Sequence, residues 1–179
     1  LRRLLQSALV PYTVSDGCVI HYAVSGDGPP LLLLPGWGAT LHDFDPLVAR
    51  LRKRFTCIAV DQRGTGDSGH PQDLWSMDTL ADDAVAVLDA AAVRDAHVLG
   101  DSLGGMAAQE MAHRHPERVR SLILLSTSPG LISWPPDPRI LLTLGARMER
   151  MERADASTDR PPDRIRELLT IPTYLGVLE

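Results

Sequence analysis

The sequence has little cysteine, no excess of positive charge and no long apolar run. Its two cysteines, Cys18 and Cys57, are too few and too far apart for a disulfide framework or a metal site, so we expect two buried free thiols. The formal net charge of −5 excludes the basic patch that would hold a domain on nucleic acid. No apolar run approaches the roughly 20 residues that span a bilayer, so no membrane partner is expected. The first residues also lack the apolar stretch and cleavage site of a signal peptide, which favours a cytoplasmic protein.

What is present is an alternation of short apolar runs and helical patterns over the first 130 residues. Apolar runs predict strands at 8–14, 19–24, 31–34, 56–60, 96–99 and 119–125. Helical spacing predicts helices at 45–54, after an N-cap at Ser76, and at 103–115. Continuous apolar strands between amphipathic helices are typical of parallel strands joined by right-handed crossovers. The sequence therefore predicts an α/β fold with a mostly parallel sheet covered by helices on both faces.

The pattern changes after Gly130, where Trp134-Pro135-Pro136-Asp137-Pro138 interrupts the alternation of strands and helices. Helices are expected at 139–153 and 163–170, with a linker between them. No strand pattern is visible in this part of the sequence. We therefore divide the chain into a sheet-forming part, residues 1–130, and a helical segment outside the sheet, residues 131–179.

The pentapeptide Gly100-Asp101-Ser102-Leu103-Gly104 has the Gly-x-Ser-x-Gly pattern, and it lies between a predicted buried strand and a predicted helix. In this position a serine lies on a sharp strand-to-helix turn, with its hydroxyl at the carboxyl edge of the sheet. A side chain at either glycine would collide with neighbouring backbone. The N-terminus of the following helix supplies free N–H groups and a partial positive charge, which suit an oxyanion. The alternative is a glycine-rich turn with an incidental serine.

A second glycine-lined loop, Pro35-Gly36-Trp37-Gly38, follows the predicted strand 31–34. A carbonyl group attacked by Ser102 needs two hydrogen-bond donors for the oxygen that becomes negative. The backbone N–H groups of Trp37 and Leu103 are the candidates for this oxyanion hole. A simple tight turn is the alternative interpretation of this loop.

These features resemble the α/β-hydrolase superfamily over roughly residues 18–130. Two further segments carry the resemblance: 61–68 is similar to the family's Asp-x-Arg-Gly-x-Gly-x-Ser segment, and 112–119 is typical of the run before the next strand. Pro35 stands where the family usually has histidine in its oxyanion loop. The resemblance implies a nucleophile elbow at Ser102 and an incomplete α/β-hydrolase core. It also implies that residues 131–179 are part of a helical lid, with candidate pocket walls, or simple lid-packing residues, at Trp134, Met148, Met151 and Tyr174.

A catalytic serine in this family also needs an acid and then a histidine, in that order along the chain. The only histidines after Ser102 are His113 and His115, which lie on the helix that Ser102 begins, roughly 16–20 Å along its axis. Of the earlier histidines, His70 is the candidate that could approach the cleft. We expect the acid and the histidine beyond Glu179, so that the chain is the N-terminal portion of a longer hydrolase.

The resemblance implies two-step acyl transfer to water on a small-molecule substrate with a carboxylic-ester-like bond, by way of an acyl-enzyme on Ser102. No cofactor or metal is implied. Serine at this position disfavours epoxide-hydrolase and haloalkane-dehalogenase chemistry, for which the similar families place aspartate there. Residues 1–179 alone are expected to be inactive and to self-associate through an exposed sheet edge. The alternative is a degenerate, non-catalytic fold that binds a ligand and pairs with another chain.

Overall fold

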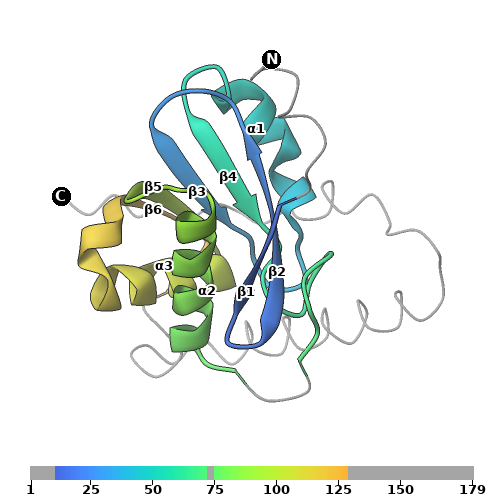
Figure 1. Cartoon of the computed structure of the whole chain (residues 1–179). Helices are drawn as coiled ribbons and strands as arrows, with labels where there is room; N and C mark the ends of the chain where they lie inside the picture. The colour runs from blue at the N-terminus through green and yellow to red at the C-terminus, as the bar shows by residue number, and fades with distance from the viewer. Residues whose placement is uncertain (1–10, 72–74, 129–179) are drawn as a thin grey trace. The chain divides into compact units, whose positions relative to one another are not determined.

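A computed structural model describes residues 11–71 and 75–128 of this chain (Figure 1). Its strands are β1 (Tyr12–Ser15), β2 (Cys18–Ser25), β3 (Pro30–Leu34), β4 (Thr56–Val60), β5 (Ala96–Asp101) and β6 (Val119–Leu125). Its helices are α1 (Asp45–Leu51), α2 (Met77–Ala90) and α3 (Leu103–Arg114), with short 3-10 turns η1 (Leu41–Phe44) and η2 (Pro116–Arg118).

The six strands form one sheet in the order β1-β2-β4-β3-β5-β6. Strand β3 pairs in parallel with β4 and β5, and β5 pairs in parallel with β6. Strand β2 is antiparallel to both of its neighbours, β1 and β4. The predicted α/β fold with a mostly parallel sheet is therefore confirmed, with an antiparallel hairpin added at one edge. Because β3, β4 and β5 are parallel, the loops after all three emerge at one carboxyl edge.

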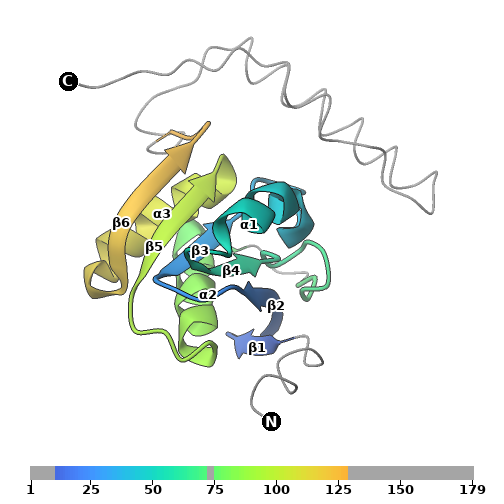
Figure 2. The same cartoon turned by 90° about the horizontal axis from the view of Figure 1, so that it is seen from above.

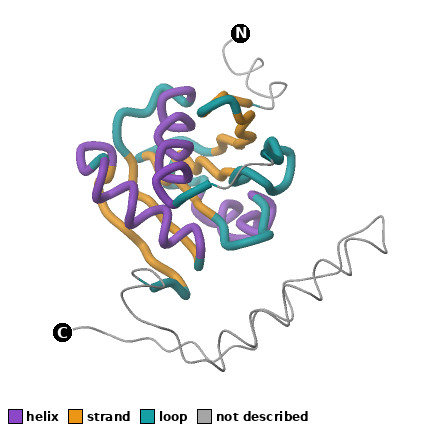
Figure 3. Tube along the Cα trace, turned by 90° about the horizontal axis from the view of Figure 1, so that it is seen from below, coloured by secondary structure: helices purple, strands orange, loops and turns teal. Residues whose placement is uncertain are grey.

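Helices lie on both faces of the sheet, as Figures 2 and 3 show. Helices α2 and α3 pack on one face over a core centred on Ile20, Leu32, Ile58 and Val98. On the other face, η1 and α1 pack against a smaller cluster that includes Leu31, Leu33, Cys57 and Leu99. Alternate residues of each strand point to opposite faces, which is why neighbouring leucines of β3 belong to different clusters.

On the second face, β6 is exposed within the described residues. Register pairing places Ile123 of β6 beside Leu99, on the face of η1 and α1. Ile123 is nevertheless 42% exposed and Leu125 43% exposed. Within residues 11–71 and 75–128, no helix covers this face at β6.

Local signals in the sequence located most of these elements. Ser76 is the N-cap of α2, and its hydroxyl oxygen accepts a hydrogen bond from the Thr79 N–H. Strand β4 has the predicted bounds, whereas α1 ends at Leu51 rather than at residue 54. The first strand begins at Tyr12, and residues 8–10 of its predicted span lie outside the described part of the chain.

Cys18 and Cys57 are buried free thiols, as predicted, and burial raises the pKa of both. A raised pKa keeps a thiol protonated and unreactive at neutral pH. None of the helices in the described ranges is long and apolar enough to cross a membrane. The expected helices at 139–153 and 163–170, the candidate pocket walls there and the division at residue 130 fall outside those ranges or depend on residues outside them, and they stay predictions.

Candidate active site

The segment between β5 and α3 makes a sharp turn at Ser102, which is the N-cap of α3. Ser102 has φ 49° and ψ −112°, a backbone conformation that side-chain-bearing residues rarely adopt. Such strain costs about 1–3 kcal/mol and persists only where the surrounding structure imposes it. The strand-to-helix turn predicted from the pentapeptide is therefore present, with its serine at the carboxyl edge of the sheet.

Close backbone packing explains the glycines of this turn. A Cβ atom at Gly100 would overlap the carbonyl oxygen of Gly104, and a Cβ atom at Gly104 would overlap the carbonyl oxygen of Leu34. At Gly105 the added atom would lie 2.6 Å from the Thr127 side chain. Only glycine fits where backbones approach this closely. The N-terminus of α3 therefore packs directly against the end of β3, where the second candidate loop begins.

Strand β6 and the residues after it hold the backbone of Ser102. The Ser102 N–H donates to the Leu125 carbonyl at 2.9 Å, and the Thr127 hydroxyl donates to the Ser102 carbonyl at 2.7 Å. The Ser102 carbonyl also accepts the N–H groups of Gly105 and Met106, at 3.0 and 3.2 Å. These bonds impose the strained backbone conformation of Ser102.

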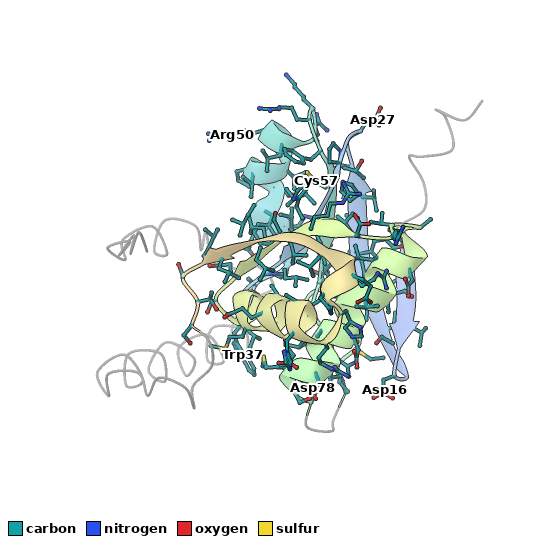
Figure 4. The ribbon with its side chains drawn as sticks, turned by 90° about the vertical axis from the view of Figure 1, so that its left-hand side faces the viewer. Asp16, Asp27, Trp37, Arg50, Cys57 and Asp78 are labelled. Atoms are coloured by element: carbon teal, nitrogen blue, oxygen red, sulfur yellow. The ribbon has the colours of Figure 1, made fainter. Side chains whose placement is uncertain are left out.

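The loop after β3 lies beside this turn. A Cβ atom placed on Gly36 would be 3.4 Å from the Cβ atom of Ser102, which is ordinary contact distance. Trp37 and Leu103 line the same small pocket of about 100 Å³, and Figure 4 shows Trp37 close to α3. Within the described ranges, neither the Trp37 N–H nor the Leu103 N–H has a hydrogen-bond acceptor. The structure thus brings the three predicted residues, Ser102, Trp37 and Leu103, into one neighbourhood.

The pocket beside the loop is shallow and largely apolar. Trp37 is 54% exposed and stacks on Trp75, with ring centroids 5.7 Å apart. The pocket is lined by Gly36, Trp37, Gly38, Gln62, Arg63, Gly64, Thr65, Trp75 and Leu103. This lining joins the loop after β3, the loop after β4 and the start of α3 at the carboxyl edge of the sheet.

Two residues directly after β4, Asp61 and Gln62, hold this loop, and sequence reasoning gave them no role. The Asp61 carboxylate accepts the Leu41 N–H at 2.7 Å and the Asp67 N–H at 3.0 Å. The side-chain amide of Gln62 donates to the Pro35 carbonyl. Both side chains are buried, at 2% and 5% exposed. Polar residues immediately after a buried parallel strand were the available signal, because such residues gather at the functional edge of the sheet.

Asp61 also pairs with His21 of β2, whose Nδ1 lies 2.6 Å from a carboxylate oxygen of Asp61. A buried histidine–aspartate pair is what a catalytic serine needs, but this one is far from Ser102. In the strand order, β2 and β5 are separated by β4 and β3, which is three strand spacings or about 14 Å. His21 is therefore a buried sheet residue that is too far away to activate Ser102.

All six histidines lie in the described ranges, and none hydrogen-bonds the Ser102 hydroxyl. His70 is exposed and follows Gly69, whose N–H donates to Val19 of β2, on the far side of β4 from Ser102. The weak expectation that His70 approaches the cleft therefore has no support. The remaining histidines bond elsewhere or are exposed: His42 to Asp45, His97 to Ser121, and His115 to Asp82, with His113 exposed.

Asp101, immediately before Ser102, is half-buried. Burial and the nearby Asp43 carboxylate raise the pKa of Asp101 above its usual value. No hydrogen bond joins its side chain to any group in residues 11–71 and 75–128, and none joins it to the Ser102 hydroxyl. The same residues contain no group of three or more histidine, cysteine or acidic side chains arranged to hold a metal ion.

Comparison with known proteins places these features in context. A family model described as the alpha/beta hydrolase fold matches residues 29–176. A pimeloyl-[acyl-carrier protein] methyl ester esterase of Aeromonas hydrophila is 37% identical over 62% of this chain and 43% of its own length. A soluble epoxide hydrolase of a Corynebacterium species is 33% identical over 65% of this chain and 41% of its own length.

Solved structures agree with the sequence matches. The structure of an N-acyl homoserine lactone degrading enzyme has a TM-score of 0.67 and 35% identity, and the match covers 70% of this chain and 49% of that one. This chain therefore spans less than half the length of each of these three proteins. Their names include an esterase, an epoxide hydrolase and a lactone-degrading enzyme, so the similarity alone leaves the scissile bond open.

Proposed function

The chain belongs to the α/β-hydrolase fold family, and on this premise we propose that the complete protein is a serine hydrolase of carboxylic-ester-like bonds. The observation that carries the proposal is the strained backbone of Ser102, at a strand-to-helix turn beside two N–H groups that have no acceptor within the described residues. Strain at one polar residue on a functional edge is typical of active sites. In this proposal the turn is a nucleophile elbow.

The proposed reaction has two steps. The Ser102 hydroxyl oxygen attacks the carbonyl carbon and loses its proton to a base, and the alcohol leaves with that proton. Water then cleaves the acyl-serine bond, which releases a carboxylic acid and restores the hydroxyl. In both steps the N–H groups of Trp37 and Leu103 bind the oxygen that becomes negative. Each such donor contributes about 2.7–4 kcal/mol of transition-state stabilisation.

The base and its orienting acid are proposed to lie in the part of the complete protein that these 179 residues do not include. All six histidines are placed, and none contacts the Ser102 hydroxyl. The named relatives are more than twice as long as the matched segment. We therefore propose that residues 1–179 alone do not turn over an ester, while they contain the nucleophile and the oxyanion hole.

The nature of residue 102 favours ester chemistry over epoxide opening. Serine forms an acyl-enzyme with a carbonyl substrate, and its hydroxyl must be deprotonated as it attacks. The free N–H groups of Trp37 and Leu103 suit an oxygen that becomes negative on a tetrahedral carbon. The methyl ester esterase and the lactone-degrading enzyme carry carbonyl substrates in their names, which supports the same choice.

The test is covalent labelling of the complete protein with a fluorophosphonate probe, which reacts with activated serines. We expect Ser102→Ala to abolish labelling and hydrolysis of 4-nitrophenyl acetate, with a loss of roughly 10⁶-fold in kcat. Ser126→Ala is the matched control, because Ser126 also has a positive φ (48°) and directly follows the neighbouring strand β6. Labelling of Ser126→Ala should equal that of the unmodified protein.

The alternative is a non-catalytic member of the fold that binds a ligand or another chain. The lack of a histidine near Ser102 is the observation that favours it. It predicts no labelling of the complete protein by the probe. Absence of labelling in a complete, folded protein would therefore overturn the hydrolase proposal and leave this alternative.

A further inference from the structure

Two consecutive residues directly after β4 hydrogen-bond to the two ends of the loop that joins β3 to η1. At its start, the Gln62 side-chain amide donates to the Pro35 carbonyl. At its end, the Asp61 carboxylate accepts the Leu41 N–H at 2.7 Å. Strands β3 and β4 are parallel neighbours, so the end of β4 lies directly beside the start of this loop. The candidate oxyanion donor, Trp37, lies between the two fastened points.

The bond from Gln62 fixes one peptide plane of the loop. Gln62 is 5% exposed, and only the NH₂ end of its amide can bond a carbonyl oxygen, so its orientation is determined by its partner. The peptide bond between Pro35 and Gly36 is trans and planar, so holding its C=O toward Gln62 holds its N–H on the opposite side. The direction in which the chain enters Gly36, the residue beside Ser102, is thereby set.

A second hydrogen bond fixes the next peptide plane, that between Gly36 and Trp37. The Ala39 N–H donates to the Gly36 carbonyl at 3.2 Å. Because the Gly36–Trp37 peptide is also planar, the Trp37 N–H points away from Ala39, and it has no acceptor within residues 11–71 and 75–128. Two consecutive planes are thus held by their carbonyl oxygens, which leaves the N–H of Trp37 free and oriented.

We propose that Gln62 is a positioning residue, which orients the Trp37 N–H toward the oxyanion by holding the Pro35 carbonyl. The inference rests on the proposed serine hydrolase function. Gln62 acts through the backbone and has no contact with the reacting atoms. Its amide must keep the Trp37 donor within hydrogen-bond reach of the oxygen that becomes negative, and removal of one such donor costs about 10²–10³ in kcat. Loss of the Gln62 amide displaces the donor without removing it, so we expect a loss in kcat of about 10- to 100-fold.

The test compares Gln62→Met with Gln109→Met in the complete protein. Methionine has a similar length and no donor. Gln109 is the matched control, because its amide also donates to backbone carbonyls, those of Gly105 and Ser128, at 3.1 and 3.0 Å, and does not contact the loop 35–41. Both variants lose amide-to-carbonyl bonds, so an effect of general destabilisation would appear in both.

Two ester substrates distinguish a loss of donor positioning from a general loss of structure. The rate of 4-nitrophenyl acetate hydrolysis is compared with that of its thiono analogue, in which sulfur replaces the carbonyl oxygen and accepts hydrogen bonds weakly. We expect Gln62→Met to lower kcat for the oxygen ester 10- to 100-fold with KM little changed, and to lower the oxygen-to-sulfur rate ratio by a similar factor. For Gln109→Met the ratio should be unchanged. Equal ratios in the two variants would overturn the positioning role.

Amide hydrogen exchange in residues 36–41 tests the same role without any turnover. If the complete protein hydrolyses neither ester and is not labelled by a fluorophosphonate, the serine hydrolase proposal fails. The exchange measurement then still decides whether Gln62 holds the loop. Faster exchange in Gln62→Met than in Gln109→Met supports the structural part of the inference, that Gln62 holds this loop, and equal exchange overturns it.

Discussion

The two flanks of the sheet both expose apolar side chains, and they differ in the charged side chains that they bury. On the flank of β2 and β4, charged groups are buried: Arg63 and Asp83 are 4% and 3% exposed, and their side chains are 2.6 Å apart. On the flank of β6, apolar groups are exposed: Ile123 and Leu125 are 42% and 43% exposed. The ion pair on this flank, between Arg120 and Asp95, lies at the surface.

Within the described residues, this difference lies in how buried charges are satisfied. On the β4 flank every buried charge has a partner, and no buried side-chain nitrogen or oxygen in the described ranges lacks a hydrogen bond. Partners from β2, η1, α2 and the loop after β4 supply these bonds. Strand β6 has the apolar sequence of a covered strand but lacks cover on the face of η1 and α1 in the described ranges.

The largest expected effect comes from breaking the buried ion pair between Arg63 and Asp83 on the β4 flank. Arg63→Met in the complete protein leaves the Asp83 carboxylate buried without its cation. An uncompensated buried charge of this kind lowers the free energy of unfolding by about 3–5 kcal/mol. Guanidinium denaturation measures the loss. Asp83→Leu added to Arg63→Met should recover most of it, because the remaining charge is then gone.

The matched change on the β6 flank sharpens the comparison. Arg120→Met breaks an ion pair whose arginine side chain is 43% exposed, where such pairs contribute less than about 1 kcal/mol. A loss at Arg120 as large as that at Arg63 would mean that the β6 flank is buried in the complete protein. Losses of a few tenths of a kcal/mol would keep the two flanks distinct.

How far the sequence could predict these features depends on whether a feature is local. The turn at Ser102 follows from a local pattern, glycines between an apolar run and a helix, and the structure has that turn. Strands β3 and β4 were located by their apolar runs for the same reason. The antiparallel pairing of β2 with β4 joins residues 32 to 38 positions apart, and nothing in the local pattern distinguishes it from parallel pairing.

Features that depend on distant partners could not be predicted. Gln62 and Pro35 are 27 residues apart, and their bond exists only because β3 and β4 are neighbours in the sheet. The exposure of Ile123 likewise depends on what packs over β6, and the apolar sequence of the strand does not specify its packing partner. The roles of Ser102, Trp37 and Leu103 remain predictions that the geometry supports, since their test is chemical.

The next largest effect concerns association at β6. Residues 1–179 alone are predicted to self-associate through this edge strand, because its outer backbone, which pairs with no other described strand, and its apolar side chains can pair with a second copy. Ile123→Lys places a charge there and should weaken association roughly tenfold, or about 1.4 kcal/mol. Val14→Lys is the control, since Val14 is 65% exposed on the other edge strand, β1. Sedimentation velocity across a concentration series measures both, and equal weakening by the two changes would place the contact elsewhere.

The last comparison distinguishes two carboxylates at the carboxyl edge by the sign of the stability change when each is replaced by an amide. Burial and the Asp43 carboxylate raise the pKa of Asp101 in the folded protein, so its ionised form destabilises the fold. Asp101→Asn should therefore raise the free energy of unfolding at pH 7. The gain should shrink as the pH falls through the raised pKa and vanish below the unfolded value near 3.9, because Asp101 is then protonated in both states.

Asp61→Asn should have the opposite sign at pH 7, because the Asp61 carboxylate accepts the N–H groups of Leu41 and Asp67 and contacts the ring nitrogen of His21. An amide there would turn an NH₂ group toward donors and leave buried N–H groups unsatisfied, at a cost of about 1–3 kcal/mol. Urea denaturation of both variants at pH 7 and pH 3.5 gives the two signs. If Asp101→Asn were also destabilising at pH 7, a hydrogen-bond donor from the rest of the complete protein must bind the Asp101 carboxylate. Asp101 would then be part of the active site.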